Sequence, residues 1–512
     1  VGILAGQGLS SHLLQRLRGG ETPDVVLGSL RGNFALAWAV NGSVHLTADQ
    51  TRSRTILYRK QGREVLASDD PWHVVGDDTT LDLDSVAEFA TAGFVSGQHT
   101  IFQNVRALQA GERVSFDITG AHSTRYFEYR PTYDRNDSID QLCVEHDAVI
   151  MAAMERSVAS IGDRQLVVPL SAGLDSRLIA ACLKRMGQER VFCFSYGRPG
   201  NPDAEGAREY AKQLGYDWHM VPYEAADMAQ MLGSEKVRAF WKMCTAGVSM
   251  PFFNDYPALE LMQRQEMIEP DAVFMPGQSG DFIVGSHLKY VFDPEVNPDP
   301  TSVRAAIVHK HYLMWEDIMR RGWVREAVGQ RMDEILDPLP LGTDRERAGA
   351  YEYWEWQERQ CKHVINEGRT YEFFGHEWRM PLWDVEVMEF WRGCTLEHKV
   401  GSYLYREYLA TINPGGVFAH ERLTGPVYQP GRVAIPPRQR QGLSRVPLLG
   451  HLLWLRERYR KHKKNFAYGP TGTAQAYGRT RYLFREPGKR HEGSLLLKDF
   501  LRDVYGVRIE KL

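Results

Sequence analysis

Strands and helices alternate between residues 138 and 224, and this alternation restricts the fold more than any other feature of the chain. Apolar runs typical of buried strands lie at 165–170, 190–197 and 218–224. Helical patterns precede and separate them, at 138–160, 176–187 and 203–215. Strands that alternate with helices imply βαβ units and a parallel sheet. The sequence therefore predicts an α/β domain in this part of the chain.

The flanking parts differ from this pattern. The first 125 residues hold short, partly alternating β-prone runs separated by turn residues, with helical pieces at 10–20 and 83–94, which predicts a mixed α+β domain. A chain of 512 residues is too long for one compact core. We expect three parts: residues 1–125, residues 126–425, and a basic extension over 426–512.

Composition excludes several classes of protein. The chain is 43% hydrophobic and 25% charged, with a net charge of −3, which is typical of a globular protein and gives no overall field toward nucleic acid. We find no apolar run long enough to span a bilayer and no signal peptide. The six cysteines include no CxxC pair, so we expect buried thiols in a reducing, cytoplasmic compartment and no structural metal.

The strand at 165–170 runs into the polar turn "SAGLDS" and then into a helix. Free N–H groups in the first turn of a helix attract an anion. Ser171 and Ser176 add hydroxyl donors, and Asp175 suits a bridging Mg²⁺. These features predict a pyrophosphate-binding loop. The Walker motif, GxGxxG and GxSxG are all absent. The plain alternative is that Ser and Asp only cap the helix.

Several segments, in order over about residues 20–410, resemble the asparagine synthetase family. "SAGLDS" resembles the SGGxDS loop of ATP pyrophosphatases, which cleave ATP between its α- and β-phosphates. "MPGQSGDFIVGSH" resembles the family's SGEGSDExFGGY loop, and "HEWRMPLWDVEVMEF" its ExRxPFxDxxLxEF segment. "LRGNFALAWAV" and "LTADQTRSRTILYRK" are similar to the second half of its glutaminase domain.

The resemblance implies an α/β synthetase domain with a parallel sheet, like that of the adenine nucleotide alpha hydrolases. A partial α+β glutaminase domain of the N-terminal-nucleophile type would precede it. The reaction would activate a carboxylate as an acyl-adenylate, release pyrophosphate, and let ammonia or an amine displace AMP. ATP and Mg²⁺ are the implied cofactors. The partners would be a small carboxylate and a nitrogen donor, with no nucleic acid, and a homodimer is one assembly that the sequence leaves open.

The resemblance also assigns site residues. Asp175 and Asp281 would hold Mg²⁺ and, with Gln278, would lie at the reacting atoms. Glu377, Arg379 and Asp384 would support the wall of the site. The ATP and pyrophosphate site would comprise Ser171, Ala172, Gly173, Leu174, Asp175, Ser176, Tyr196 and Gly277.

Two departures bear on the substrate. Gln278 replaces the family's first Glu, and Gln cannot accept a proton as a base. Phe282 replaces its second Glu and removes a polar group expected near the acyl substrate. The basic residue that steadies pyrophosphate has no clear match, and Arg406 and Arg432 are the candidates. Activity on a carboxylate other than aspartate is therefore favoured.

The N-terminal part departs as well. A working glutaminase of this family begins with a Cys, whereas this sequence begins with Val1. Either the chain lacks its first strands or the glutaminase is inactive. Relatives that resemble asparagine synthetase include β-lactam synthetases, lasso-peptide cyclases and sugar-acid amidotransferases. The remaining alternatives are a thiolation enzyme with the same loop, and a non-catalytic binding protein that keeps the fold.

The C-terminal extension combines apolar and basic residues. Its apolar part contains Leu448, Leu449, Leu452, Leu453 and Leu455. The basic run contains Arg456, Arg458, Arg460, Lys461, Lys463 and Lys464. A helix docked on its own protein is the favoured interpretation, and peripheral contact with an anionic membrane is the alternative.

Overall fold

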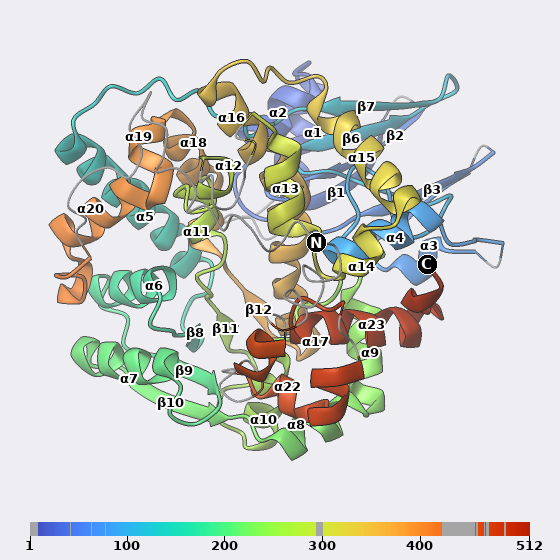
Figure 1. Cartoon of the computed structure of the whole chain (residues 1–512). Coiled ribbons are helices and arrows are strands. Elements are labelled where there is room, and N and C mark those ends of the chain that lie inside the picture. The colour runs from blue at the N-terminus through green and yellow to red at the C-terminus, as the bar shows by residue number, and fades with distance from the viewer. Residues whose placement is uncertain are drawn as a thin grey trace.

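The computed structural model describes residues 9–40, 42–62, 64–76, 78–292, 299, 301–421, 456, 459–464, 466, 471–485 and 488–512. Its centre is a five-stranded parallel sheet in the order β10-β9-β8-β11-β12 (Figure 1). The strands are β8 (Leu166–Pro169), β9 (Val191–Gly197), β10 (Asp217–Pro222), β11 (Val273–Phe274) and β12 (Glu377–Trp378). The predicted α/β fold is confirmed in this part of the chain.

The first helices of this sheet begin and end close to the positions expected from the sequence. They are α5 (Ile139–Ala159), α6 (Leu174–Arg185) and α7 (Pro202–Leu214). A capping box starts α5, where Ser138 Oγ accepts from the Gln141 amide. The core strands are apolar on both faces, because helices cover both. In the register of the sheet, Leu166 lies opposite Val191 on one side and Val273 on the other.

The N-terminal part contains two antiparallel sheets, which confirms the expected α+β class (Figure 1). One sheet has the order β1-β2-β6-β7 and the other the order β4-β3-β5. The strands are β1 (Ala35–Val40), β2 (Ser43–Ala48), β3 (Leu57–Gln61), β4 (Glu64–Ser68), β5 (Arg106–Ala107), β6 (Glu112–Phe116) and β7 (Ala121–Arg125). The helices are α1 (Leu9–Arg18), α2 (Pro23–Ser29), α3 (Pro71–Val74) and α4 (Leu83–Ala92).

The remainder of the chain is mainly helical. The helices before residue 340 are α8 (Ala225–Leu232), α9 (Glu235–Cys244), α10 (Tyr256–Arg264), α11 (Gly280–Ile283), α12 (Lys289–Phe292), α13 (Val303–His311), α14 (Glu316–Met319) and α15 (Gly322–Leu336). Those after it are α16 (Asp344–Trp354), the π-helix η1 (Glu355–Val364), α17 (Gly368–Phe373), α18 (Val385–Gly393), α19 (Leu396–Lys399), α20 (Tyr403–Ile412), α22 (Thr473–Ala476) and α23 (Glu492–Tyr505).

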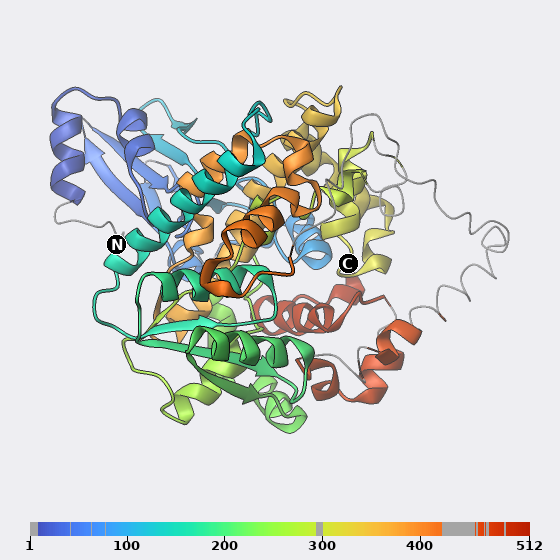
Figure 2. The ribbon, with the colours of Figure 1, turned by 90° about the vertical axis from the view of Figure 1, so that its left-hand side faces the viewer.

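The described end of the C-terminal extension packs onto the body of the protein. Helix α22 contacts α8, and α23 contacts both α9 and α4. Figures 1 and 2 show α23, in red, beside the middle of the molecule rather than projecting from it. The apolar residues of the expected amphipathic helix, and Arg458, lie outside the described residues. Peripheral membrane contact through that segment stays a prediction.

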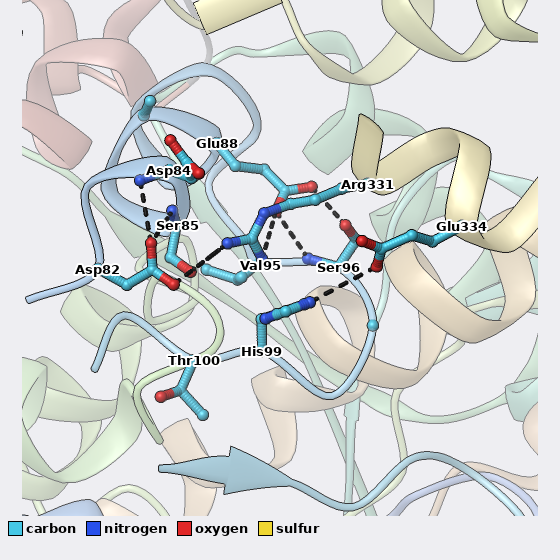
Figure 3. A network of polar contacts seen from close by, with 12 residues as sticks. Asp82, Asp84, Ser85, Glu88, Val95, Ser96, His99, Thr100, Arg331 and Glu334 are labelled. Carbon is cyan, nitrogen blue, oxygen red and sulfur yellow. Dashed lines mark hydrogen bonds and ion pairs between the residues drawn. The ribbon is translucent and has the colours of Figure 1, made fainter. Parts of the chain in front are cut away.

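A buried polar network fixes α4 of the N-terminal part against α15 (Figure 3). Arg331 Nη2 donates to Ser85 Oγ at 2.9 Å and lies 3.4 Å from Asp82 Oδ2. Its Nη1 lies 3.8 Å from Glu88 Oε2. Glu88 also accepts from both the amide and the hydroxyl of Ser96. Because buried charges need such partners, this network attaches α15 to α4.

Helix α5 carries a buried histidine that makes the fold sensitive to acid. The Trp391 indole N–H donates to His146 Nε2 at 3.1 Å, and His146 is 1% exposed. Burial lowers the pKa of His146 to about 3. As the pH falls, the unfolded chain binds a proton at this histidine near pH 6.5, whereas the folded chain does so only near pH 3. The contribution of neutral His146 to the free energy of unfolding is therefore complete above pH 6.5 and is lost as the pH falls toward 3.

We expect His146→Gln, whose amide oxygen can still accept from Trp391, to flatten this pH dependence. Between pH 6.5 and 5 the wild type should lose about 2 kcal/mol of unfolding free energy through His146. Urea unfolding at pH 5, 6 and 7 measures the difference between the two proteins. Exposed His73→Gln is the control and should follow the wild type. Parallel pH profiles of wild type and His146→Gln would refute the assignment.

Candidate functional site

A cavity of about 540 Å³ opens where β8, β9 and β11 end. The carboxyl ends of parallel strands are the usual place for a ligand in an open α/β sheet. Of the sequence-predicted residues, those that line it are Ser171, Gly173, Leu174, Asp175, Ser176, Tyr196, Gly277, Gln278 and Asp281. The fold thus brings together residues more than a hundred positions apart in the sequence.

The "SAGLDS" turn is held by its own hydroxyl groups. The Ser171 amide donates to Ser176 Oγ at 3.0 Å, and the Gly173 amide donates to Ser171 Oγ at 3.1 Å. Gly173 is the N-cap of α6, and no side chain caps that helix. The simple capping interpretation therefore does not account for the turn. The first residues of α6, Leu174, Asp175 and Ser176, line the cavity. Ala172 does not line the cavity; its Cβ faces Gly206 of α7.

Asp175 and Asp281 are neighbours because two glycines let their backbones approach. A Cβ on Gly280 would lie 2.6 Å from Asp175 Cγ. A Cβ on Gly277 would lie 2.5 Å from the Ser176 amide nitrogen. Burial, together with the negative charge of Asp281, raises the pKa of Asp175 to about 7. The Tyr405 hydroxyl donates to Asp175 at 2.9 Å and acts in the opposite direction on this pKa. Two carboxylates this close repel each other unless a cation lies between them.

This donor set fits Mg²⁺. Magnesium usually takes one or two protein carboxylates and completes its shell with phosphate and water oxygens. Asp281 is 57% exposed at its side chain and Asp175 is half-buried, so both can reach a ligand in the cavity. Within the described part of the chain, no group of three or more His, Cys, Asp or Glu side chains is placed to hold a metal.

His287 joins the Asp281 side of the site, and sequence reasoning missed it. Its Nε2 lies 3.1 Å from Asp281 Oδ2, and its Nδ1 lies 2.5 Å from Glu355 Oε1. Burial acts against the charged ring, but Glu355 and Asp281 raise the pKa of His287 to about 9. Burial also acts to raise the pKa of Asp281, and the hydrogen bond and charge of His287 outweigh it and lower that pKa.

Two cations line the cavity that the sequence did not single out. Lys310 comes from α13 and Arg359 from η1. Buried Arg359 Nη1 has no hydrogen-bond partner in the structure. Of the candidates named from sequence, Arg406 binds Glu421 at 3.1 Å and does not line the cavity, and Arg432 lies outside the described residues. Because His287 is paired with Asp281 and Glu355, the positive charge left to face an anion in this cavity comes mainly from Lys310 and Arg359.

Gln278 lies beside two buried carboxyl groups, Asp255 and Glu367. Gln278 and Asp255 line the cavity, and Gln278 Oε1 has no hydrogen-bond partner. Tyr371 donates to Asp255 Oδ2 at 2.7 Å. Burial raises the pKa of Asp255 despite hydrogen bonds from tyrosines, and burial with the neighbouring Asp255 raises that of Glu367 well above its ordinary value. The raised pKa values favour the neutral form of both carboxyl groups.

Phe282 does not face the cavity. It is 1% exposed and makes edge contacts with Tyr129 and Trp383 at centroid distances of 6.3 and 5.9 Å. Its role in the structure is therefore core packing. Ser279 has a positive φ of 65° and donates to Gln360 Oε1 at 2.9 Å, which holds the loop in a strained turn.

The residues expected to support the wall lie behind it. Arg379 binds Glu377 at 3.0 Å and donates to Ser160 Oγ at 2.7 Å. Asp384 caps α18 through the Glu386 amide at 2.8 Å and binds Arg156 at 2.9 Å. These contacts attach β12 and α18 to α5, and neither Glu377, Arg379 nor Asp384 lines the cavity.

All six cysteines are free and buried, as expected from the sequence. None of the described residues that line the cavity is a cysteine. Among the helices that the structure describes, none combines the length and apolar character needed to cross a bilayer.

Two comparisons with known proteins both match asparagine synthetases. Residues 149–427 match the family model described as asparagine synthase. The chain is also similar to a probable asparagine synthetase [glutamine-hydrolyzing] of Acanthamoeba polyphaga mimivirus, at 27% identity over 217 residues. That match covers 38% of this chain and 38% of the viral protein, so the chain spans well under half of this relative's length.

Two solved structures show a weaker likeness. One is a glutamine phosphoribosylpyrophosphate amidotransferase from B. subtilis complexed with ADP and GMP, at 12% identity and a TM-score of 0.17, covering 54% of this chain and 56% of that one. The other is described as the allosteric regulatory enzyme of purine biosynthesis, at 12% identity and a TM-score of 0.15, covering 54% of each chain. TM-scores this low do not establish a shared fold.

Proposed function

The chain belongs to the asparagine synthase family, whose model matches more than half of it, and from this premise we propose that it is an ATP-dependent ligase that forms amides from carboxylic acids. In the first step a carboxylate oxygen attacks the α-phosphorus of ATP, the bond to the bridging oxygen breaks, and pyrophosphate leaves. In the second step ammonia or an amine attacks the acyl carbon, AMP leaves, and one proton is released.

One observation carries this proposal: Asp175 and Asp281 meet beside the uncapped N-terminus of α6 in a single cavity. The helix N-terminus and the hydroxyl groups of the turn supply donors for phosphate oxygens. Held by Asp175 and Asp281, Mg²⁺ would neutralise charge on the leaving pyrophosphate. A structural ion pair would place a cation beside Asp175, whereas Asp175 faces another carboxylate.

The other residues of the cavity have distinct parts in this proposal. His287, held by Glu355, fixes the orientation of Asp281. Lys310 and Arg359 stabilise the negative charge that develops when the acid attacks. Tyr196 stacks on Tyr223 at 5.2 Å, and its ring forms the cavity wall at the end of β9, where it borders the nucleotide.

The amine's proton needs an acceptor, and Gln278 cannot be one. We assign this role to Asp255, which lines the cavity next to Gln278, with Glu367 behind it. A carboxyl pair that shares one proton carries one negative charge and can accept the second proton. The family position occupied by Gln278 would then contribute a hydrogen bond rather than a base.

Glu367→Gln should slow amide formation by about 100-fold, because glutamine cannot share a proton with Asp255 as a carboxyl group does. Exchange of labelled pyrophosphate into ATP should change less than threefold, since it reports only the first step. Exposed Glu235→Gln is the control and should behave as the wild type in both assays. An equal fall in exchange and amide formation would assign Glu367 to the first step or to folding.

The proposed function is tested by pyrophosphate release from Mg-ATP against a panel of carboxylic acids. We expect at least one acid to trigger release, and hydroxylamine or ammonia to yield the corresponding hydroxamate or amide with AMP. If no acid triggers release and the protein does not bind Mg-ATP, the chain is a non-catalytic binding protein that keeps the family's fold. Release of pyrophosphate with sulfur transfer would instead favour the thiolation alternative.

The N-terminal part of the chain, with its two antiparallel sheets, bears on the source of nitrogen. We infer that residues up to about 125 are a glutaminase-type domain, and that ammonia or an amine is the nitrogen source. The support is the α+β arrangement of two antiparallel sheets together with the sequence resemblance. Amide formation with glutamine compared with ammonium ion distinguishes a working glutaminase from an inactive one.

A further inference from the structure

The cavity at the ends of β8, β9 and β11 has one described lining residue from the C-terminal extension, Thr471. The other described residues that line it lie between Pro169 and Val364. Thr471 also lies beyond residues 149–427, which match the family model. The extension therefore adds a side chain to a cavity that the synthetase part of the chain otherwise builds.

Thr471 lies on the side of the cavity where β9 and β10 end. A Cβ on the next residue, Gly472, would lie 3.5 Å from the Tyr223 carbonyl oxygen and 3.7 Å from Arg198 Cγ. Arg198 directly follows β9, and Tyr223 directly follows β10. The ring of Tyr223 stacks on that of Tyr196, which lines the cavity. These contacts place the turn at Thr471 over the ends of the two strands.

The turn at Thr471 leads into a packed part of the extension. Thr473 and Ala474, at the start of α22, are buried, and α22 contacts α8 (Figure 1). Further along the chain, the Arg481 guanidinium donates to Asp499 Oδ1 of α23 at 2.8 Å, and α23 packs on α9 and α4. Because these packed elements follow Thr471 in the chain, the body of the protein fixes its position at the cavity.

The two sides of the cavity differ in charge. In the sheet, β11 lies on one side of β8 and β9 on the other. The groups proposed to act on metal and phosphate follow β8 and β11 or come from α13 and η1. The described lining residues near the end of β9 and the start of α7 include no basic side chain: Tyr196, Asn201, Asp203 and Ala204. An aromatic ring with neutral and acidic neighbours suits an uncharged base and ribose better than a phosphate.

We propose that Thr471 forms the wall of the nucleotide site beside the base of ATP, so that the C-terminal extension completes this site. The inference rests on the proposed function, which assigns the phosphates to the turn after β8 and Mg²⁺ to Asp175 and Asp281. From there the nucleoside extends along the strand ends toward β9, because the β11 side holds the metal ion and the reacting acid. The Thr471 hydroxyl can donate to a ring nitrogen of the base.

Nucleotide binding and the packing of the extension are therefore linked. A ligand that contacts the turn at Thr471 stabilises the packed state of α22, and packing of α22 in turn strengthens the binding of that ligand. A ligand that has the phosphates of ATP but no nucleoside does not reach this turn. The linkage separates a wall of the base site from a segment that only packs nearby.

The first test compares calorimetric binding of Mg-ATP and of Mg-tripolyphosphate to the full chain. Tripolyphosphate keeps the phosphates and lacks the base and the ribose. We expect Thr471→Trp to lower the ratio of the two affinities, Mg-ATP over Mg-tripolyphosphate, at least tenfold, because the indole fills the space of the base. Thr480→Trp is the matched control, since Thr480 is exposed, belongs to the same extension and does not line this cavity. Thermal unfolding of both variants checks that they stay folded.

The second test uses the wild type, so it does not depend on the folding of a variant. Hydrogen exchange at the amides of α22 should slow with Mg-ATP and stay unchanged with Mg-tripolyphosphate, and exchange in β7 is the internal reference. The inference is overturned if the ratio falls less than tenfold in a folded Thr471→Trp. It is also overturned if Mg-ATP slows exchange in α22 no more than Mg-tripolyphosphate does. If the wild type binds neither ligand, the proposed function is overturned instead.

Discussion

Asp281→Asn is expected to reduce pyrophosphate release by at least about 1,000-fold, since it removes one of the two carboxylates proposed to hold the metal ion. Asparagine keeps the size of the side chain and can still accept a hydrogen bond from His287, so the loop should stay in place. Pyrophosphate release is measured at saturating Mg-ATP with the best acid of the panel. Asp175→Asn should give a loss of similar size.

Asp175→Asn should also differ from ordinary core mutations in stability. Asp175 and Asp281 repel each other in the metal-free protein, so Asp175→Asn should leave the metal-free Tm unchanged or raise it. The wild type should gain stability with Mg-ATP, whereas Asp175→Asn should gain little. Asp163→Asn is the control, because Asp163 is an exposed carboxylate that lies just before β8, at the end of that strand opposite to the "SAGLDS" turn. Full activity of Asp175→Asn would show that the site is misplaced.

Gly277→Ala should have the second largest effect, on both activity and stability. The new Cβ would lie 2.5 Å from the Ser176 amide nitrogen and 2.8 Å from the Asp175 carbonyl carbon. Both are backbone atoms at the start of α6, which cannot move as a flexible side chain would. We expect a loss of about 1–3 kcal/mol in unfolding free energy and about a 100-fold fall in pyrophosphate release, because the loops must separate.

Gly322→Ala provides the comparison for this substitution. No atom lies within 4 Å of a Cβ at Gly322, which is the first residue of α15. This variant should be neutral or slightly more stable, since alanine favours the helix. Urea unfolding and the pyrophosphate assay are run on both proteins. If Gly277→Ala keeps its activity and stability, the close approach of the two loops does not occur in solution.

The alternation of apolar strands with amphipathic helices predicted the parallel sheet. The spacing of apolar residues along each strand or helix reflects a local conformational preference, and burial of those residues reinforces it. The expected strand at 165–170 and the observed β8 at Leu166–Pro169 differ by one residue at each end. The "SAGLDS" turn could be interpreted in the same way, since the residue after a buried strand and before a helix lies at the sheet edge. These signals are contained in short, contiguous segments.

Other features of the site depend on contacts between distant segments. His287, Lys310 and Arg359 carry no motif that marks them, and they reach the cavity from a loop, α13 and η1. Phe282 was expected near the acyl substrate, but its ring packs in the core between Tyr129 and Trp383. A short helix at 280–283 decides which side chains face inward, and the sequence of that loop does not specify its rotation.

The sequence by itself determined the α/β class, the α+β class of the N-terminal part, the buried thiols and the position of the "SAGLDS" turn at the sheet edge, because strand and helix periods and turn residues are local. Only the tertiary structure decided that Asp175 meets Asp281 and that Asp255 and Glu367 lie beside Gln278. The physical reason is that charge and shape in a cavity are set by side chains from separate elements, whose approach depends on how all of them pack.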